Sequence, residues 1–405
     1  MRTIILGNGL AGTMTGRTLR ELDSSVEITI ISQEKYPYYP RPNLIDFLAG
    51  ELPLNRLFAF PPGWAEKQKL EIRLGKEVTG LDVDEMAVEI DRKERLKADQ
   101  VVLATGASPL LPAIPGIDRK GVFCLRTIDD AVSLLEFLST GPEVVVLGGG
   151  LLGLEIARAI HKRGLKQVTV VEYFNRLLPR QLDETGAGLL QSQLEKMGLK
   201  FLLGKEAVEI SGQEAVSLIK FKDGSQLTAG AVVVASGIRP RLELAVKAGL
   251  ASNRGVVVDD FLQTSRPGIY AAGDVAEHRG RIYGLIPAAF DQARTVAYNL
   301  AGQMKKYEGT IPANTLKVAG LFLTSAGLIS PEGEGFEVLS KLDKENGLYK
   351  KLILKDGQLV GAIWLGSKKG SQEITRLVQA QKNPGPYKSD LLADDFDFSR
   401  LNSLY

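Results

Sequence analysis

Three glycines near the start of the chain, Gly7, Gly9 and Gly12, have the spacing of a loop that binds a pyrophosphate. They follow the apolar run Ile4–Leu6 and precede a helical pattern that extends to about Leu22. Gly7 permits a tight turn, Gly9 leaves no Cβ between backbone and phosphate, and Gly12 lets the helix pack closely on the strand. Unpaired N–H groups at the start of that helix favour an anion. A single such motif is equally compatible with an ordinary tight turn.

A second copy of the motif follows the apolar run Val144–Leu147. Its glycines are Gly148, Gly150 and Gly153. Each copy leads to another apolar strand that ends near an acid, Glu34 in the first copy and Glu172 in the second. Both acids lie roughly twenty residues beyond the third glycine, where a carboxylate can bind the hydroxyls of an adenosine ribose. Two complete motifs predict two dinucleotides, and a flavoprotein that binds two nucleotides is the leading interpretation.

The elements around the two glycine motifs repeat in the same order. Residues 70–100 alternate apolar and charged side chains, which predicts an antiparallel ribbon that leads into the strand Gln100–Leu103. Small residues, Ala104–Ala107, end this strand. The second half has a ribbon pattern over residues 201–229 and then an apolar strand with small residues over 230–237. A duplicated α/β architecture explains this order.

Two later segments could complete a flavin site. The loop after Glu34 carries Arg41 among tyrosines and prolines, which suits a flat anionic cofactor, although a stiff surface loop would look the same. A short strand ends at Gly273-Asp274, at the edge where α/β sheets bind ligands. The helix that begins with Ile286-Pro287 could stabilise the anion of a reduced flavin. A turn aspartate and an ordinary amphipathic helix are the alternatives.

Composition limits the class of protein. The 405 residues allow two or three domains, and an apolar content of 44% supports real cores. A formal net charge of +2 gives no support for nucleic-acid binding. No apolar run reaches the length of a membrane span, and the first residues lack the pattern of a signal peptide. We therefore expect a cytoplasmic protein.

Cysteine and histidine counts limit the chemistry. The one cysteine, Cys124, excludes an intrachain disulfide and lies in an apolar run, which predicts a buried structural thiol. The two histidines, His161 and His278, are too few for a metal cluster, so no metal is expected. His161 falls within a helical pattern and is expected at the surface.

The segment from about Ala313 has a different pattern, in which short strands alternate with turns before a helix over residues 372–381. It predicts a compact α+β domain that ends in an acidic and aromatic tail over residues 394–398. Its lysines form either a solvated face or a docking surface for an acidic partner. They are Lys341, Lys344, Lys350, Lys351, Lys355, Lys368 and Lys369.

These residues together resemble the superfamily of FAD- and NAD(P)-dependent pyridine-nucleotide oxidoreductases. The match rests on both glycine motifs, Ala104-Thr105-Gly106, Tyr270–Asp274 and the Pro287 helix, in the expected order over residues 1 to about 310. Within the superfamily, the chain is most similar to NADH:rubredoxin oxidoreductases and to the flavin module of NADH-dependent nitrite reductases. Three segments carry this finer resemblance, namely Tyr39-Pro40-Arg41-Pro42, Leu125-Arg126-Thr127 and Asn314–Gly320.

The resemblance implies two Rossmann-like three-layer domains plus a small C-terminal α+β domain. Residues 1–110 and 242–312 would form a discontinuous FAD domain, residues 111–241 an NAD domain, and residues 313–405 the acceptor side or an interface. The implied FAD contacts are Gly7, Gly9, Ala11, Gly12, Glu34, Arg41, Val78, Ala104, Thr105, Gly106, Arg126, Gly273, Asp274, Ile286 and Ala289. The implied NAD contacts are Gly148, Gly150, Leu151, Leu152, Gly153, Glu172 and Gly237.

The resemblance assigns the chemistry to N5 of the flavin and names no catalytic side chain, with Glu155 placed near the nicotinamide. Related ferredoxin reductases carry a lysine where this chain has Asp46, so the lysine partner of the corresponding glutamate is missing here. The cysteine pair of the disulfide reductases is also missing, as is the cysteine near residue 42 of the peroxidases. Glu172 would favour NADH over NADPH by repelling a 2′-phosphate.

The implied function is transfer of electrons from NADH through FAD to a small acidic carrier protein such as rubredoxin or ferredoxin. A different acceptor, dioxygen or a quinone, would make the protein a peroxide-forming NADH oxidase or an NADH dehydrogenase. A third alternative is a flavin-binding subunit of a larger redox complex. The sequence does not indicate whether the protein is a monomer or a homodimer.

Overall fold

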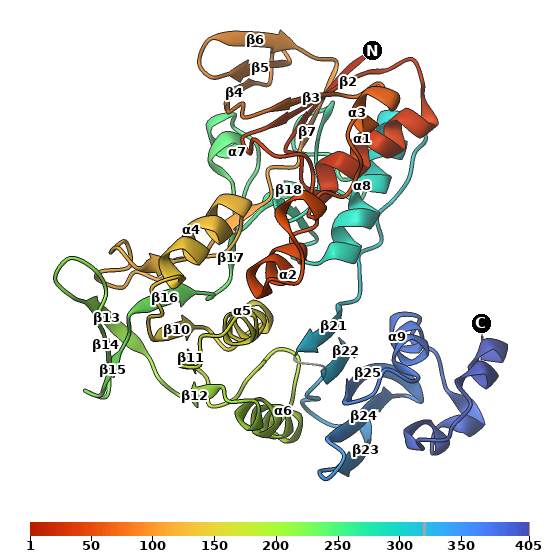
Figure 1. Cartoon of the computed structure of the whole chain (residues 1–405). Coiled ribbons are helices and arrows are strands. Elements are labelled where there is room, and N and C mark those ends of the chain that lie inside the picture. Colours follow the sequence, from red (N-terminus) through yellow and green to blue (C-terminus); the bar gives the residue numbers. More distant parts are fainter. Residues whose placement is uncertain (319–320, 405) are drawn as a thin grey trace. The chain divides into compact units, whose positions relative to one another are not determined.

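The computed structural model describes residues 1–318 and 321–404. The chain forms two compact units, each assembled from several segments (Figure 1). The first comprises residues 1–47, 52–110 and 237–310. The second comprises residues 48–51 and 111–236 and the chain from Ile311 onward. The predicted division into FAD, NAD and C-terminal domains stays a prediction, because compactness does not say which ligand a segment binds.

The first unit is built on a five-stranded parallel sheet in the order β19-β7-β1-β2-β3. Its strands are β1 (Arg2–Leu6), β2 (Glu27–Ser32), β3 (Glu71–Leu74), β7 (Gln100–Leu103) and β19 (Ile269–Ala271). Because helices and loops cover a parallel sheet on both faces, its central strands are apolar, and Ile4 and Ile5 are fully buried. The parallel alignment brings the carboxyl ends of β1, β7 and β19 to one edge of the sheet.

Helices and smaller sheets complete the first unit. Helix α1 packs against β1, β2 and helix α8 (Figure 1). An antiparallel ribbon, β4-β5-β6, follows β3, and two pairs of short strands, β8 with β17 and β18 with β20, lie outside the main sheet. The α-helices are α1 (Leu10–Leu22), α2 (Asn43–Ala49), α3 (Trp64–Lys67), α7 (Glu243–Lys247) and α8 (Ile286–Leu300), and there is one short 3₁₀ helix, η1 (Leu54–Arg56). The last residues of α2 belong to the second unit. The strands are β4 (Val78–Asp82), β5 (Ala87–Ile90), β6 (Glu94–Lys97), β8 (Ala107–Pro109), β17 (Ile238–Pro240), β18 (Val256–Val258) and β20 (Ala276–His278).

The second unit contains a parallel sheet of the same design, in the order β12-β11-β10-β16-β9. Its strands are β9 (Val122–Phe123), β10 (Val144–Leu147), β11 (Val168–Val171), β12 (Lys200–Leu202) and β16 (Ala231–Val234). The ribbon that precedes β16 is β13 (Ala207–Ser211), β14 (Leu218–Phe221) and β15 (Gln226–Thr228). The helices are α4 (Ile128–Leu138), α5 (Leu151–Lys162) and α6 (Glu184–Lys196).

The C-terminal part of the second unit is a five-stranded antiparallel sheet in the order β21-β22-β25-β24-β23. Its strands are β21 (Ala313–Val318), β22 (Leu321–Gly327), β23 (Phe336–Asp343), β24 (Leu348–Lys355) and β25 (Gln358–Leu365). Helix α9 (Ser371–Gln379) packs on β22 and β25 (Figure 1). Three short 3₁₀ helices follow, η2 (Gly385–Tyr387), η3 (Asp390–Leu392) and η4 (Phe398–Leu404).

The predicted fold class and the repeated order of elements are confirmed. Two details of the ribbons were wrong, because β3 and β12 are parallel strands of the main sheets and only the residues after them form the ribbons. The acidic and aromatic tail is part of a core, since Phe396 and Phe398 pack with the fully buried Trp364. The sequence pattern did not predict β22, and Ala319 and Gly320 of the C-terminal motif lie outside the described residues.

Candidate functional site

The first glycine motif forms a turn in which two of the glycines are sterically required. Gly7 has a φ of +119°, and an added Cβ would lie 2.2 Å from the carbonyl oxygen of Ala104. An added Cβ on Gly12 would lie 1.9 Å from the carbonyl oxygen of Gly7. The turn is therefore held tightly between the ends of β1 and β7 and the first turn of α1.

The second glycine motif repeats this geometry with independent neighbours. Gly148 has a φ of +122°, and an added Cβ would lie 2.5 Å from the carbonyl oxygen of Ala235. For Gly153 the added Cβ would lie 1.9 Å from the carbonyl oxygen of Gly148. Ala235 directly follows β16, as Ala104 directly follows β7, so each glycine turn packs against the equivalent residue of its own sheet.

The middle glycine of each motif faces open space and not a neighbouring residue. An added Cβ on Gly9 or on Gly150 would meet nothing within 4 Å. Both residues are N-caps, of α1 and α5 respectively, and neither helix start has a side-chain cap. The first N–H groups of both helices thus lack the partner that a capping side chain gives, and a pyrophosphate can accept their hydrogen bonds.

Asn8 adds a donor to the first turn that the sequence motif did not predict. Its Oδ1 accepts a hydrogen bond from the Thr13 hydroxyl at 2.9 Å, which fixes the orientation of the amide. Asn8 is 7% exposed, and its Nδ2 has no hydrogen-bond partner within residues 1–318 and 321–404. A buried, unpartnered N–H group beside an open turn fits a polar ligand such as the phosphates or ribose of a dinucleotide.

Gly273, another predicted FAD residue, lies beside the first helical turn of α1. An added Cβ on Gly273, which follows β19, would lie 2.9 Å from Cβ of Ala11. The Gly273 N–H donates to Gln292 Oε1 at 2.8 Å, so helix α8 is fixed to the same edge of the sheet. Helix α8 also begins without a side-chain cap and has a proline in its first turn. Gln292 is a positioning residue that the sequence did not reveal, because nothing marks it among the polar residues of an amphipathic helix.

Glu34 of the first unit lies in a polar cluster within the loop that follows β2. It accepts hydrogen bonds from the Tyr39 hydroxyl at 2.5 Å and from both terminal nitrogens of Arg41. The Arg41 guanidinium also lies over the Tyr39 ring, 4.8 Å from its centroid. The structure therefore brings the predicted Glu34 and Arg41 together, with about a third of each side chain exposed.

Glu172 of the second unit has a different environment. The residue is 7% exposed, and its carboxylate accepts the N–H of Gly149 at 2.6 Å and the N–H of Phe174 at 2.9 Å. A glycine at position 149 permits this close approach, because an added Cβ would lie 3.0 Å from Cβ of Glu172 and 2.9 Å from a terminal methyl of Leu177. Glu172 is thus locked against the second glycine turn.

The remaining predicted contacts lie on the elements that the sequence indicated, and their roles stay predictions. Thr105 and Gly106 follow β7, Val78 begins β4, Asp274 follows β19, and Ile286 and Ala289 lie in the first turn of α8. Leu151 and Leu152 begin α5, which also carries the half-buried Glu155. Arg126 belongs to the second unit, where it directly precedes Thr127, the N-cap of α4, whereas Gly237 belongs to the first unit.

Cys124 is half-buried, so the predicted buried thiol is only partly correct. Burial raises the pKa of the Cys124 thiol, and the nearby Asp130 carboxylate raises it further. A raised pKa keeps the sulfur as a thiol, which is a poor nucleophile. His161 is also half-buried and not fully exposed, because it packs against the Gly198 turn.

Several lysines of the C-terminal sheet are bonded within the chain. Lys341 and Lys350 pair with Asp394 and hold the pKa of its carboxyl down to about 2. Lys351 pairs with Asp183 at 2.8 Å. Lys350 and Lys351 are at most 9% exposed, so for these two both the solvated and the docking interpretation were wrong. The tail covers Lys350, and the N-cap of α6 covers Lys351.

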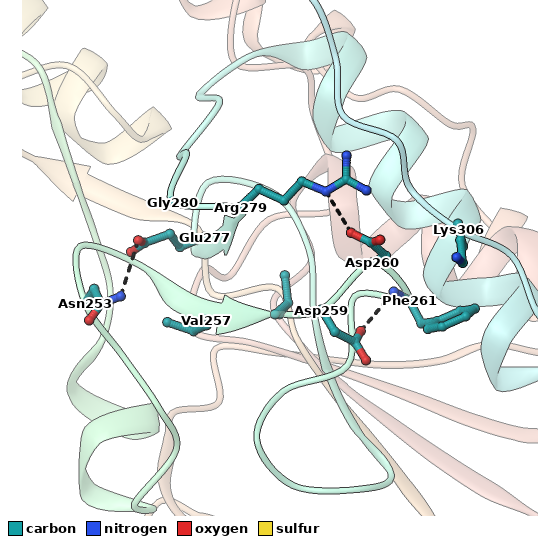
Figure 2. A pocket seen from close by; sticks show the side chains of 10 residues that line it. Asn253, Val257, Asp259, Asp260, Phe261, Glu277, Arg279, Gly280 and Lys306 are labelled. Atoms are coloured by element: carbon teal, nitrogen blue, oxygen red, sulfur yellow. Dashed lines mark hydrogen bonds and ion pairs between the residues drawn. The ribbon is translucent and has the colours of Figure 1, made fainter.

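A hollow of about 490 Å³ lies along β18 and β20 in the first unit (Figure 2). Three of its charged side chains, those of Arg279, Asp260 and Glu277, are hydrogen-bonded within the protein. Arg279 donates to Asp260 at 2.8 Å, and Glu277 accepts from Asn253 at 3.4 Å and from the Gly255 N–H at 2.8 Å. None of the predicted nucleotide-binding residues lines this hollow, so we do not assign it to a nucleotide.

Comparison with known proteins identifies the family. Residues 1–293 match the family described as pyridine nucleotide-disulphide oxidoreductase. The chain belongs to that family. Residues 312–382 match a second family, described as the rubredoxin NAD+ reductase C-terminal domain. The resemblance to the pyridine-nucleotide oxidoreductases drawn from the sequence is confirmed.

Individual relatives differ in what they do. The chain is 38% identical to the assimilatory nitrate reductase electron transfer subunit of Bacillus subtilis, over 96% of this chain and 51% of that protein. It is 32% identical to an NADH oxidase of Methanocaldococcus jannaschii, over 92% of this chain and 89% of that protein. The solved structure of NADH:rubredoxin oxidoreductase from Clostridium acetobutylicum superposes with a TM-score of 0.79 at 26% identity, over 99% of both chains. The chain spans about half the length of the nitrate and nitrite reductase relatives that it matches.

Within residues 1–318 and 321–404, no helix is long and apolar enough to cross a membrane.

Proposed function

We propose that this protein oxidises NADH and passes the electrons through FAD to a small iron–sulfur or rubredoxin-type carrier protein. The observation that carries the proposal is the match of residues 312–382 to the C-terminal domain of rubredoxin reductases, in a chain with a single cysteine. Without a cysteine pair there is no disulfide relay within the chain, so the acceptor must receive its electrons from the flavin.

The first glycine motif is the proposed FAD site. The N–H groups at the start of α1 and the Asn8 amide would bind the pyrophosphate and its surroundings. Glu34 would bind the adenosine ribose once its hydrogen bonds with Tyr39 and Arg41 rearrange. The uncapped start of α8, held near Gly273 by Gln292, would favour negative charge on the isoalloxazine ring. When bound, FAD accepts a hydride and releases electrons singly, chemistry that side chains do not supply.

The second glycine motif is the proposed NADH site. The start of α5 would bind the nucleotide pyrophosphate, and the Glu172 carboxylate would accept the ribose hydroxyls. A carboxylate at this position repels a 2′-phosphate, which favours NADH over NADPH. The Arg176 guanidinium donates to the Pro179 carbonyl at 3.4 Å within its own loop.

The direct test is anaerobic reduction of a purified carrier by NADH. We expect the protein reconstituted with FAD to reduce rubredoxin or a ferredoxin much faster than it reduces an unrelated acidic protein of similar size. If acceptor reduction does not exceed the rate of a mixture of free FAD and NADH, the proposed function is wrong.

A second candidate is direct reduction of dioxygen, which the similarity to an NADH oxidase of comparable length favours. Dioxygen would then be the physiological acceptor. The product would be hydrogen peroxide and not water, because the chain lacks the cysteine near residue 42 that the related peroxidases carry. Turnover with oxygen that equals or exceeds turnover with the carrier, with one peroxide formed per NADH, would favour this candidate.

A third candidate is a flavin-binding subunit of a larger redox complex, which the similarity to an electron transfer subunit favours. It predicts slow turnover of the isolated chain with all small acceptors. Stable co-purification with a redox partner at fixed stoichiometry, together with faster turnover in that complex, would separate it from the first two.

A further inference from the structure

Strand β23 is the last strand of the C-terminal sheet and pairs with β24 on one side (Figure 1). In the described parts of the chain, residues 1–318 and 321–404, its backbone makes no hydrogen bond with the backbone of any segment other than β24. Every second residue of an antiparallel edge strand directs its N–H and C=O groups away from the sheet. The outer side of β23 is therefore a template on which a further strand can pair.

The length and regularity of β23 distinguish it from the edges of the two parallel sheets. The edge strands of those sheets have two to four residues. Short strands and bulges are two ways in which proteins prevent an edge from pairing with another chain. β23 has eight residues and pairs with β24 without a register shift, whereas β24 has such a shift against β25. Neither device protects this edge.

Two apolar side chains of β23 are exposed. Val338 and Leu342 are 45% and 41% exposed, and they lie on the same face of the strand because they are four residues apart. Their neighbours on β24, Ile353 and Tyr349, are buried. The apolar surface of the sheet thus continues to its edge, where a further strand would remove it from water.

The charges of β23 have an order that is complementary to itself. When two copies of a strand pair antiparallel, a twofold axis relates them, so each contact between two residues occurs twice. With the axis beside Leu339, Glu337 of each copy lies opposite Lys341 of the other, and Phe336 lies opposite Leu342. Opposite charges across an antiparallel pair stabilise it.

The neighbouring registers are less favourable. An axis beside Ser340 places Glu337 opposite Asp343, and an axis beside Lys341 places the two lysines opposite each other. Like charges in this position destabilise the pair. An axis beside Val338 gives no pair of opposite charges within the strand. The charges therefore select one register.

Both charged residues of this register also have a partner within their own chain. Glu337 pairs with Lys388 at 2.8 Å, and Lys341 pairs with Asp394 at 2.5 Å. All four side chains are at least 40% exposed. Because a carboxylate accepts several hydrogen bonds and an ammonium group donates three, a second copy can add its contacts without breaking these pairs.

We infer that β23 is an interface between two copies of this chain, which pair antiparallel with the twofold axis beside Leu339. The two five-stranded sheets then form one sheet of ten strands. A second copy is the occupant because the charge order of the strand is complementary to that same strand. The inference is independent of the proposed function, since no nucleotide or carrier takes part in the contact.

The test measures the mass of the full chain by sedimentation equilibrium over a range of micromolar concentrations, because a contact of one strand pair is small. The wild type should form a dimer. Glu337→Lys and Lys341→Glu each place like charges opposite one another twice, so each should raise the dissociation constant by roughly tenfold or more. In an equal mixture of the two variants, a heterodimer regains both pairs of opposite charges. The mixture should therefore dimerise with nearly the affinity of the wild type.

The control variant is Lys388→Gln, which removes the intrachain partner of Glu337 and leaves β23 unchanged. It should leave the dissociation constant unchanged, which separates the contact between copies from the ion pair within each copy. Thermal unfolding of each variant checks that the fold is intact, and recovery of the dimer in the mixture is independent evidence that both charge variants fold.

Three results would overturn the inference. A wild type that stays monomeric at all these concentrations shows that β23 is not an interface between copies. A dimer that both charge variants preserve uses another surface. Variants that dissociate but do not recover in the mixture contradict the proposed register. None of these results bears on the reduction of a carrier by NADH, which is measured separately.

Discussion

The two glycine turns are built alike, but the acids that follow them are held differently. In both turns the outer glycines are required by a close carbonyl oxygen, and the middle glycine faces open space. Glu34 lies in a partly exposed cluster with Arg41 and Tyr39. Glu172 is buried and bonded to the backbone of its own turn through Gly149.

The difference follows from one residue in each motif. Asn8 stands in the first turn where Gly149 stands in the second, and the lack of a side chain at Gly149 lets Glu172 approach its turn closely. The first site therefore has a partly exposed ion pair and an amide donor beside its turn, whereas the acid of the second site is buried and bonded to backbone N–H groups. In the proposed function the first turn would hold a cofactor that stays bound and the second a substrate that exchanges at every turnover.

The largest effect should come from Gly12→Ala and Gly153→Ala. Each adds a Cβ 1.9 Å from a backbone oxygen, so the helix must move, at a cost of about 3 kcal/mol. We expect Gly12→Ala to lose flavin, and Gly153→Ala to keep flavin but lose affinity for NADH. Flavin absorbance and urea unfolding measure both effects.

Gly188→Ala on α6 is the matched control, because its added Cβ would meet nothing within 4 Å. It should be neutral or stabilise the protein by up to about 1 kcal/mol. If the three variants behave alike, the steric explanation of the two turns is wrong.

The next effect concerns the two acids. Glu172→Gln turns one acceptor oxygen into a donor opposite two N–H groups in a buried site, so we expect a loss of about 2 kcal/mol in the free energy of unfolding. Glu34→Gln breaks a partly exposed pair and should cost less than about 1 kcal/mol. Denaturant unfolding of both variants without added nucleotide gives the comparison, and the reverse ranking would contradict it.

A smaller effect separates ligand binding from folding. Gly9→Ala and Gly150→Ala place a methyl group in the open space of each turn, so the fold should tolerate them within about 0.5 kcal/mol. The nucleotide should lose roughly tenfold in affinity, because the methyl group occupies the position of closest approach to the pyrophosphate. Calorimetry with FAD tests the first variant, and NADH titration tests the second. Unchanged affinities would show that the open spaces do not hold phosphates.

The smallest effect concerns the second unit, in which Asp183, the N-cap of α6, is bonded to Tyr349 and Lys351 of the C-terminal sheet. Burial would raise the pKa of the Asp183 carboxyl, but hydrogen bonds from Lys351, the Gly186 N–H and Tyr349 bring it below the ordinary 3.8. The carboxylate therefore stabilises the folded state above pH 4, and this contribution is lost as the pH falls further. At pH 6 the Asp183→Asn variant should have a lower free energy of unfolding than the wild type. This difference should be about 1 kcal/mol larger at pH 6 than at pH 3. A difference independent of pH would contradict this assignment.

The sequence predicted what depends on periodicity and on glycine spacing. Apolar strands before each motif, the duplicated order and the helix of residues 10–22 are all present. It did not predict that Lys350 and Lys351 are buried, because their partners Asp394 and Asp183 lie far away in the chain. The roles of Asn8 and Gln292 were missed for a similar reason, because each role depends on a hydrogen-bond partner that only the folded chain brings close.

We propose two nucleotide sites that work together with no sulfur between them, and stoichiometric reduction of the flavin tests this most directly. Anaerobic titration of the protein reconstituted with FAD should reach full reduction of the flavin at one NADH per FAD, and Cys124→Ser should give the same end point. A chain that binds no FAD, or one that consumes a second NADH before the flavin is fully reduced, would contradict the account.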